Sequence, residues 1–319
     1  MKVSVLIITY NHAKFIAQAL DSVLMQKVNF DYEILISEDC STDSTRDIII
    51  GFQKRYPDRI RLLLSEQNLN SNEVIVRGIQ ASQGQYIALL DGDDYWTSPY
   101  KLQKQVDFLD NNPECAMCFH DVTEFYEDGS REPQNFIFVN QKEIVTLADL
   151  LAGNFCYTCS AIFRRGLFGD FPDWYYLLEM GDYPLHVLNA QHGKIGYIHE
   201  IMGTYRIHSG GYWSTKPKIQ QLRESIEAYK YISAHLNYKY DRIIRGTVSK
   251  HYYKIAVEYE DGGDLVKARS YAIKCFVECP FNKRIPHKDL FKLLIRLHAP
   301  LLYKLIRTLG RSVRLITYS

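Results

Sequence analysis

Short apolar runs alternate with segments of helical periodicity through the first third of the chain. Apolar runs of a few residues bounded by polar ones are typical of buried strands, and apolar positions three and four apart are typical of helices. The pattern predicts strands at 3–9, 33–37, 60–64 and 86–90, and helices at 15–24, 42–56, 73–81 and 100–109. Such alternation predicts βαβ units, hence an α/β fold with a mainly parallel, Rossmann-like sheet.

The pattern changes after residue 110. It predicts strands at 115–125, 154–163 and 194–199, and a helix from 182 to 191 with Asp182 at its N-cap. From about residue 218 the chain is expected to be helical, which divides it into domains 1–217 and 218–319. Residues 253–279 resemble a single tetratricopeptide repeat, which cannot bury its own apolar face and should pack on neighbouring helices.

Charge and composition exclude several classes of partner. The 319 residues include 38 basic and 37 acidic ones, so neither global charge nor a local basic motif indicates nucleic acid. The first residues are expected to form a strand rather than a signal segment, and no stretch approaches the roughly 20 apolar residues that cross a bilayer. We therefore expect a cytoplasmic protein.

The seven cysteines include two C-x-x-C pairs, Cys115/Cys118 and Cys156/Cys159, a spacing found in zinc and redox sites. Each pair lies in a segment expected to be a strand, where positions three apart point to opposite faces. The distance along the chain between the pairs also exceeds that of zinc ribbons. We therefore favour buried free thiols in a reducing compartment over structural zinc.

An acidic cluster follows the strand predicted at 86–90. Asp91, Asp93 and Asp94 surround Gly92, directly after a run that is apolar enough to be buried on both faces. Open α/β sheets bind ligands at the carboxyl ends of their strands. Three carboxylates this close repel one another unless a cation or a basic group neutralises them. A hard divalent ion that holds a diphosphate suits this position.

Further polar groups stand at or near other strand ends. They are Thr9, Tyr10 and Asn11 after the first strand, Glu38 and Asp39 after the second, Arg77 in the helix before the fourth, and the late sequence Tyr205-Arg206-Ile207-His208. In order and spacing, these groups and the acidic cluster resemble glycosyltransferase family 2, the inverting enzymes with a GT-A fold. The resemblance extends over residues 2–214.

The resemblance implies a nucleotide pocket lined by Thr9, Tyr10, Asn11, Glu38 and Asp39, in which Asp39 accepts the imide N–H of uracil. This chain has Glu38-Asp39 where the family usually has two aspartates, and Cys40 where it has glycine. A turn rich in Ser, Thr and Asp that caps the next helix is the alternative reading, and both can hold.

For the diphosphate, the resemblance implies that Asp93 binds Mg²⁺ or Mn²⁺ and that Asp91 contacts the ribose or the metal. Gly92 would let the backbone approach a ligand closely. Arg77 would approach the nucleotide or its diphosphate, or else be a solvated helix residue in a salt bridge. The role of Asp94 stays open.

For catalysis, the resemblance implies that Asp182 is the base, with Glu179 as second choice; the alternative is that Asp182 only caps a helix. His208 would be a further metal ligand or a structural histidine, and Arg206 would face the diphosphate. The glycine-rich, aromatic residues 209–214 suit a mobile lid over the donor.

These roles together predict a metal-dependent inverting glycosyltransferase. It would move a sugar from a nucleotide diphosphate, with a UDP-sugar expected, to a hydroxyl of a glycan or lipid-linked acceptor in bacterial surface polysaccharide synthesis. One alternative is a sugar nucleotidyltransferase, but residues 9–14 lack the glycine-rich, basic triphosphate loop of that class. The other is a catalytically inactive binding or scaffold protein.

The last part of the chain is basic and amphipathic. Residues 285–316 interleave Leu, Ile and Phe with seven Lys or Arg, and no acidic residue follows Asp289. This pattern is typical of segments that bind an anionic membrane surface, and would place the protein on the inner face of the plasma membrane. The alternative is a helical cap whose apolar stripe packs on the protein.

Overall fold

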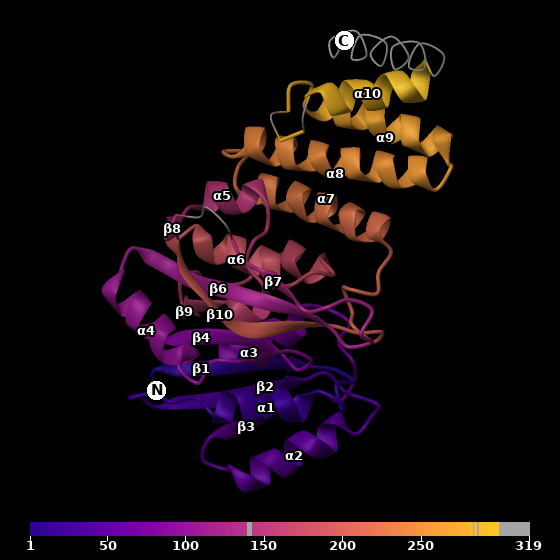
Figure 1. The fold of residues 1–319 in the computed structure, drawn as a ribbon. Coiled ribbons are helices and arrows are strands. Elements are labelled where there is room, and N and C mark those ends of the chain that lie inside the picture. Colours follow the sequence, from indigo (N-terminus) through magenta and orange to yellow (C-terminus); the bar gives the residue numbers. More distant parts are fainter. Residues whose placement is uncertain (139–141, 283, 286, 300–319) are drawn as a thin grey trace, which may run out of the picture. The chain divides into compact units, whose positions relative to one another are not determined.

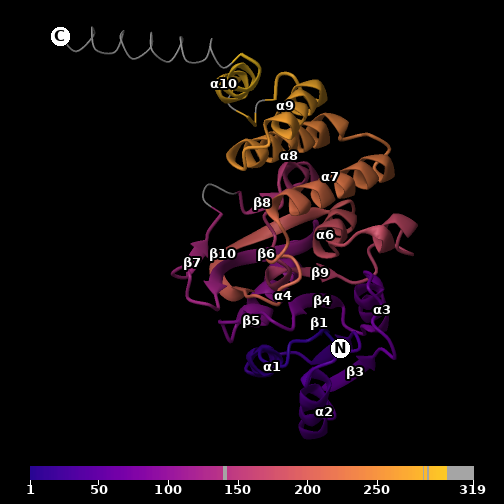
Figure 2. The same ribbon diagram turned by 90° about the vertical axis from the view of Figure 1, so that its right-hand side faces the viewer.

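The computed structural model describes residues 1–138, 142–282, 284, 285 and 287–299. The chain divides into two compact units, Met1–Thr215 and Lys216–Ser319. Figure 1 shows the first as a mixed sheet with helices and the second as a series of helices, and Figure 2 gives a second view.

The first unit is built on a parallel four-stranded core. β1 (Val3–Thr9) pairs in parallel with β2 (Tyr32–Glu38) and β4 (Tyr86–Asp91), and β2 pairs with β3 (Ile60–Leu64). β1, β2 and β4 are buried along nearly their whole length. The apolar runs of these strands are uninterrupted because side chains on both faces of a central parallel strand lie under helices.

The sheet continues beyond β4 with mixed pairing. Within the described residues its order is β3-β2-β1-β4-β9-β6-β10-β5, with the short strands β7 and β8 at its side. The added strands are β5 (Tyr95–Trp96), β6 (Cys115–Tyr126), β7 (Gln134–Phe136), β8 (Ile144–Val145), β9 (Ile162–Arg164) and β10 (Lys194–Ile207). The expected α/β class with a mainly parallel sheet is confirmed.

Helices cover both faces of this sheet. On one face, α1 (Ile16–Leu24), α2 (Thr45–Arg55) and α4 (Lys101–Asn111) pack on β1, β2 and β4 in one apolar core. On the other, α3 (Glu73–Ala81) contacts β1 and β2, and α6 (Asp182–Ala190) contacts β6. Two short elements, α5 (Leu147–Ala152) and the 3₁₀ helix η2 (Asp173–Leu177), complete the connections.

Two local predictions are wrong. Most of the strand expected at 154–163 is absent; the segment holds a 3₁₀ turn, η1 (Thr158–Ser160), before β9. There Ser160 Oγ donates to the Tyr157 carbonyl at 2.7 Å, a local bond that competes with strand pairing. In α6 the N-cap is Gly181, and Asp182 is already the first helical residue.

The second unit contains four described helices. They are α7 (Lys218–His235), α8 (Asp241–Asp261), α9 (Leu265–Glu278) and α10 (His287–His298). Ala256 of α8 and Ala268 and Ala272 of α9 are fully buried with Leu293 and Leu297 of α10. The expected helical C-terminal extension is confirmed, and the α8–α9 pair occupies the part that resembles a tetratricopeptide repeat.

The predicted membrane segment 285–316 is only partly covered, because residues 300–316 lie outside the described residues. Within it, Leu290, Leu293 and Leu297 of α10 are buried. This part of the segment therefore packs its apolar stripe on the protein, as the alternative reading expected. Among the described helices, none combines the length and apolar content needed to cross a membrane.

Candidate active site

The predicted site residues meet at the carboxyl edge of the parallel strands. The register aligns Thr9 with Glu38 and Ile8 with Asp91. Beyond the strand ends, Asp39 N donates to the Thr9 carbonyl at 3.0 Å and Gly92 N donates to the Ile8 carbonyl at 2.8 Å. Three loops that are distant in sequence are thereby held side by side.

Glu38 and Arg77 bind the loop that follows β2. The buried Glu38 carboxylate is paired with Arg46 and accepts a 2.5 Å hydrogen bond from Ser41 N. Arg77 donates from Nε to Ser37 Oγ at 2.9 Å and from Nη2 to the Glu38 carbonyl at 2.8 Å. The Glu38 carboxylate and the Arg77 guanidinium therefore hold the loop that follows β2 in place.

Asp39 and Asn11 are held by hydrogen bonds to neighbouring loops. Asp39 is buried, and its Oδ1 accepts from Leu69 N at 2.9 Å and from Ser65 Oγ at 3.2 Å. Asn11 has a positive φ of 55°, and its Oδ1 accepts from Thr42 N at 2.8 Å. The neighbouring Tyr10 is exposed. Asp39 thus has one oxygen fixed by the protein, which orients the other.

Gly92 lies where no side chain fits. A Cβ at this position would come within 2.6 Å of Thr9 Oγ1 and 2.8 Å of His12 Nδ1. Thr9 Oγ1 and His12 Nδ1 are themselves 3.3 Å apart. The glycine therefore permits the close approach of the β1 and β4 loops.

The three aspartates of the cluster differ in environment. Burial, together with repulsion from Asp93 and Asp182, raises the pKa of Asp91 well above its usual value. Burial also acts on Asp93, but attraction to His12 and the hydrogen bond with His208 outweigh it and lower the pKa of that carboxyl. The surroundings therefore favour the charged form of the Asp93 carboxyl and disfavour that of Asp91.

Asp94 has a structural task. Its Oδ1 accepts a 2.8 Å hydrogen bond from the backbone N–H of Arg206 in β10. Burial and repulsion from Asp93 and Asp91 raise the pKa of Asp94 well above its usual value. The buried Asp94 carboxyl therefore joins the loop after β4 to the neighbouring strand β10.

Arg206 lies near the end of β10, and its guanidinium contacts the backbone of the acidic cluster. Its Nε donates to the Asp93 carbonyl at 2.8 Å, its Nη2 donates to Gln18 Oε1 at 2.6 Å, and its Nη1 pairs with Glu127. The guanidinium also lies over the Phe15 ring, 4.7 Å from the centroid. Arg206 thus fixes the backbone that carries Asp93.

Asp93 and His208 are the pair that best fits a divalent cation. His208 Nε2 lies 3.0 Å from Asp93 Oδ2, and His12 Nε2 lies 3.6 Å from the same oxygen. Within the described ranges, no three His, Cys, Asp or Glu side chains form a complete cation site. Ions that act on nucleotides take few protein ligands and complete their shell with phosphates and water. The Asp93 carboxylate suits Mn²⁺ or Mg²⁺, and the imidazole nitrogens favour Mn²⁺ of the two.

Asp182 lies near Asp91, on which its charge acts. It is the first residue of α6 and follows the N-cap Gly181. Thr158 Oγ1 donates to Asp182 Oδ2 at 3.3 Å, and repulsion from Asp182 contributes to the raised pKa of Asp91. Glu179 is exposed and accepts a 3.0 Å hydrogen bond from Tyr212 OH in the glycine-rich segment. Asp182, not Glu179, therefore faces the acidic cluster.

Sequence reasoning missed Thr158 and the place of His12. Thr158 lies in the 3₁₀ turn where a strand was expected, so no motif marked it. His12 stands three residues after Thr9, and this short spacing next to a strand end is the one signal that could have drawn attention to it.

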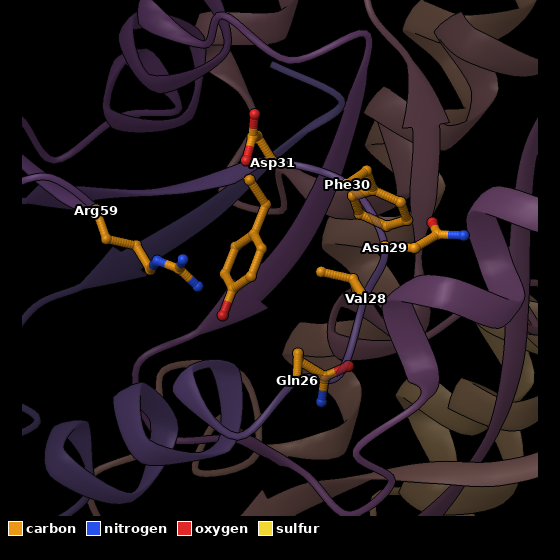
Figure 3. Close-up of a pocket in the computed structure, with 7 residues that line it drawn as sticks. Gln26, Val28, Asn29, Phe30, Asp31 and Arg59 are labelled. Carbon is orange, nitrogen blue, oxygen red and sulfur yellow. The ribbon is translucent and has the colours of Figure 1, made fainter.

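A separate hollow of about 380 Å³ lies at the amino-terminal side of β2 (Figure 3). Its lining includes Asn29, Asp31 and Arg59, and the Arg59 guanidinium lies 4.4 Å from the centroid of the Tyr32 ring. None of the predicted site residues lines it.

Comparison with known proteins agrees with this geometry. The family model described as Glycosyl transferase family 2 matches residues 4–171, more than half of the chain. This chain belongs to glycosyl transferase family 2. An uncharacterized protein of Mycobacterium tuberculosis is 38% identical over 217 residues, which cover 66% of this chain and 60% of that relative. This chain therefore matches less than two-thirds of that relative's length.

A second relative carries a functional name. A Bacillus subtilis protein named as a teichuronic acid biosynthesis glycosyltransferase, TuaG, is 34% identical over 149 residues, covering 47% of this chain and 56% of TuaG.

Solved structures share the fold. S. aureus TarS residues 1–349, in complex with UDP-GlcNAc, matches with a TM-score of 0.64 at 19% identity, over 98% of this chain and 92% of that one. The mannosyltransferase PcManGT of Pyrobaculum calidifontis, in complex with GDP-Man and Mn²⁺, matches with a TM-score of 0.55 at 15% identity, over 94% and 87%. The expected GT-A fold is confirmed.

Proposed function

We propose that the protein is a metal-dependent, inverting glycosyltransferase that uses a nucleotide diphosphate sugar, with UDP as the nucleotide. The observation that carries this proposal is that Asp182, to which Thr158 Oγ1 donates at 3.3 Å, lies close enough to Asp91 for the two carboxylates to repel each other. A candidate base thus lies near a donor-side carboxylate, next to the loops that would line the nucleotide pocket. The UDP-GlcNAc and GDP-Man complexes of TarS and PcManGT support a nucleotide-sugar donor.

In this proposal the nucleotide lies against Thr9, Tyr10, Asn11 and Asp39, and the second oxygen of Asp39 accepts the imide N–H of uracil. Glu38 and Arg77, whose charged groups are engaged within the loop, act by holding Asp39 in place. This refines the direct contact with nucleotide or diphosphate that the sequence suggested for them.

Asp93 and His208 would hold Mn²⁺ or Mg²⁺, with Asp91 directed to the same ion or to the ribose. The ion, when bound, neutralises charge that develops on the departing diphosphate. Arg206 positions Asp93 through the backbone. Gly92 acts indirectly, because its lack of a side chain lets the loops after β1 and β4 lie close together beside the proposed diphosphate site.

Asp182 would remove the proton of the acceptor hydroxyl as that oxygen attacks the anomeric carbon from the face opposite the diphosphate. Inversion follows from this single displacement. Glu179 is then a partner of Tyr212 in the lid rather than the base.

Two substitutions separate binding from chemistry. Asp93→Ala should abolish metal-dependent UDP binding in titration calorimetry, whereas Asp182→Asn should bind UDP normally and lose transfer. Asp21→Asn, an exposed carboxylate of α1, is the control for a change of charge. Full transfer activity in Asp182→Asn would rule out this base.

Turnover assays with UDP-sugar and with UTP distinguish the transferase from the alternative functions. A sugar nucleotidyltransferase would form nucleotide sugar from UTP and a sugar 1-phosphate, and a scaffold protein would bind UDP without turnover. Slow UDP-sugar hydrolysis that needs Mn²⁺ favours the transferase over both.

We further infer a glycan or lipid-linked acceptor and a cytoplasmic protein that is peripheral on the inner face of the plasma membrane. The name of TuaG supports a role in surface polysaccharide synthesis. The basic composition of residues 285–316 supports contact with anionic lipid. Membrane association is tested below independently of the chemistry.

A further inference from the structure

Helix α9 is apolar on two opposite faces. Its inner face carries Ala268, Ala272 and Cys275, which are fully buried. The opposite face carries Val266 and Val277, which are 76% and 66% exposed. An amphipathic helix that packs on one side needs only one apolar face.

The exposed apolar residues of α9 form a stripe along one side of the helix. Ile273, 48% exposed, lies between Val266 and Val277 on the same side, because spacings of seven and four residues return to one side of a helix. Phe281, just after α9, is 80% exposed, and Phe291 of α10 is exposed as well. Single exposed apolar residues are ordinary, whereas an aligned set marks a contact surface.

The charge around this stripe has one sign. Residues 265–277 contain three basic residues and no acidic one. Lys267 is exposed beside the stripe, and its ion pair with Asp264 at 2.9 Å is a solvent-exposed one, which binds weakly. Lys274 adds a second ammonium group seven residues further along the helix.

The charge asymmetry extends over the whole chain. Residues 265–319 hold 12 Lys or Arg and 2 Asp or Glu, whereas residues 1–264 hold 26 and 35. The near-zero net charge therefore hides a strongly basic end and an acidic remainder. A basic end attracts an anionic surface, and the strength of this attraction depends on the salt concentration.

We propose that the outer face of α9, formed by Val266, Lys267, Ile273, Lys274 and Val277, docks on an anionic lipid bilayer. The aliphatic side chains enter the boundary between headgroups and acyl chains, and the lysines meet lipid phosphates. This extends the membrane association proposed above to residues outside 285–316, and it does not depend on the transfer reaction.

Two other occupants fit less well. A second copy of the chain would bring two basic faces together, which costs free energy. A soluble polyanion would satisfy the lysines but would leave the aliphatic stripe in water, without the gain that burial of apolar surface provides.

Vesicle flotation tests the proposal with the full chain. Vesicles of phosphatidylcholine with about one-third phosphatidylglycerol should carry the protein, and pure phosphatidylcholine should not. Val266→Ser/Val277→Ser should weaken binding about tenfold or more. Lys267→Gln/Lys274→Gln should weaken it about fivefold per lysine. Met25→Ser, an exposed apolar residue of the first unit, should change nothing.

Several results would overturn the proposal. They are no flotation of the wild type, unchanged flotation of the valine variant, and a valine variant that changes oligomeric state instead of lipid binding. Loss of all flotation on truncation after Ala299, with no effect of the valine changes, would assign binding to the tail alone. Equal binding of wild type and valine variant to a soluble polyphosphate, with no flotation, would assign the face to a polyanion.

The experiment separates this proposal from the enzymatic one. Mn²⁺-dependent binding of UDP in solution is measured on the same variants and should be unchanged. A chain that binds UDP but no vesicle refutes only the docking face, and a chain that floats but does not bind UDP refutes only the enzymatic proposal.

Discussion

Replacement of Thr158 by valine removes one hydroxyl and leaves the side chain nearly the same shape. Thr158 Oγ1 donates to Asp182 Oδ2 at 3.3 Å. A threonine hydroxyl has one proton, and here the Asp182 carboxylate accepts it. Its loss should leave Asp182 free to rotate away from the acceptor hydroxyl.

The size of the effect follows from the bond. Hydrogen bonds to charged groups contribute about 1.5–3 kcal/mol. A separation of 3.3 Å is at the long end of the range, so we take the lower value, about 1.5 kcal/mol. That corresponds to about a tenfold fall in kcat, because each 1.4 kcal/mol is a factor of about ten. KM for the donor should change less than about twofold, since Thr158 does not line the nucleotide loops.

Initial-rate kinetics with a UDP-sugar and a suitable acceptor measure this split between kcat and KM. Thr158→Ser keeps the hydroxyl and should restore most of the rate. In an Asp182→Asn background, the valine substitution should have little further effect on residual activity, because the group it positions is already disabled. Thr158→Val with kcat within about twofold of wild type would refute the positioning role.

Three further predictions concern Gly92, Asp94 and the buried Lys101 of α4. Gly92→Ala should destabilise the fold by about 1–3 kcal/mol, because the added Cβ would lie 2.6 Å from Thr9 Oγ1; an unchanged free energy of unfolding in denaturant titration would contradict this. Asp94→Asn should keep activity within about threefold, since an amide oxygen can still accept the Arg206 N–H, and initial rates check it. Burial lowers the pKa of Lys101 to about 7, so between about pH 7 and 10 the unfolded chain binds more protons and stability rises with pH. Lys101→Met should remove that rise and stabilise the fold at pH 7 by up to roughly 4 kcal/mol. Thermal melts of the wild type and the variant across this pH range measure the difference. Melting temperatures that change with pH in parallel in the two proteins would contradict the reasoning.

The strands of the core were predictable because their environment is uniform. β1 and β3 begin and end where the apolar pattern predicts, and β4 ends one residue later, at Asp91. A strand covered by helices on both faces must be apolar throughout, and only the residues past its end can be polar. The same reasoning located the acidic cluster, since polar residues after such strands gather at one edge.

The segment around η1 was not predictable in this way. Its residues are apolar and β-branched enough to suggest a strand, but Ser160 and Asn154 make local hydrogen bonds to nearby backbone groups instead. Such bonds depend on the backbone geometry of a few residues and leave no periodicity in the sequence. For this reason the sequence did not reveal Thr158, which donates to Asp182.

The sequence by itself determined which strand ends carry carboxylates and that the first unit is an α/β fold. The tertiary structure decided which of those carboxylates are available. Asp94 is taken by the N–H of Arg206, 112 residues away, and Glu38 is taken by Arg46, whereas Asp93 lies beside His208. Adjacent aspartates are alike in sequence, and they differ only through partners that distant segments bring to them.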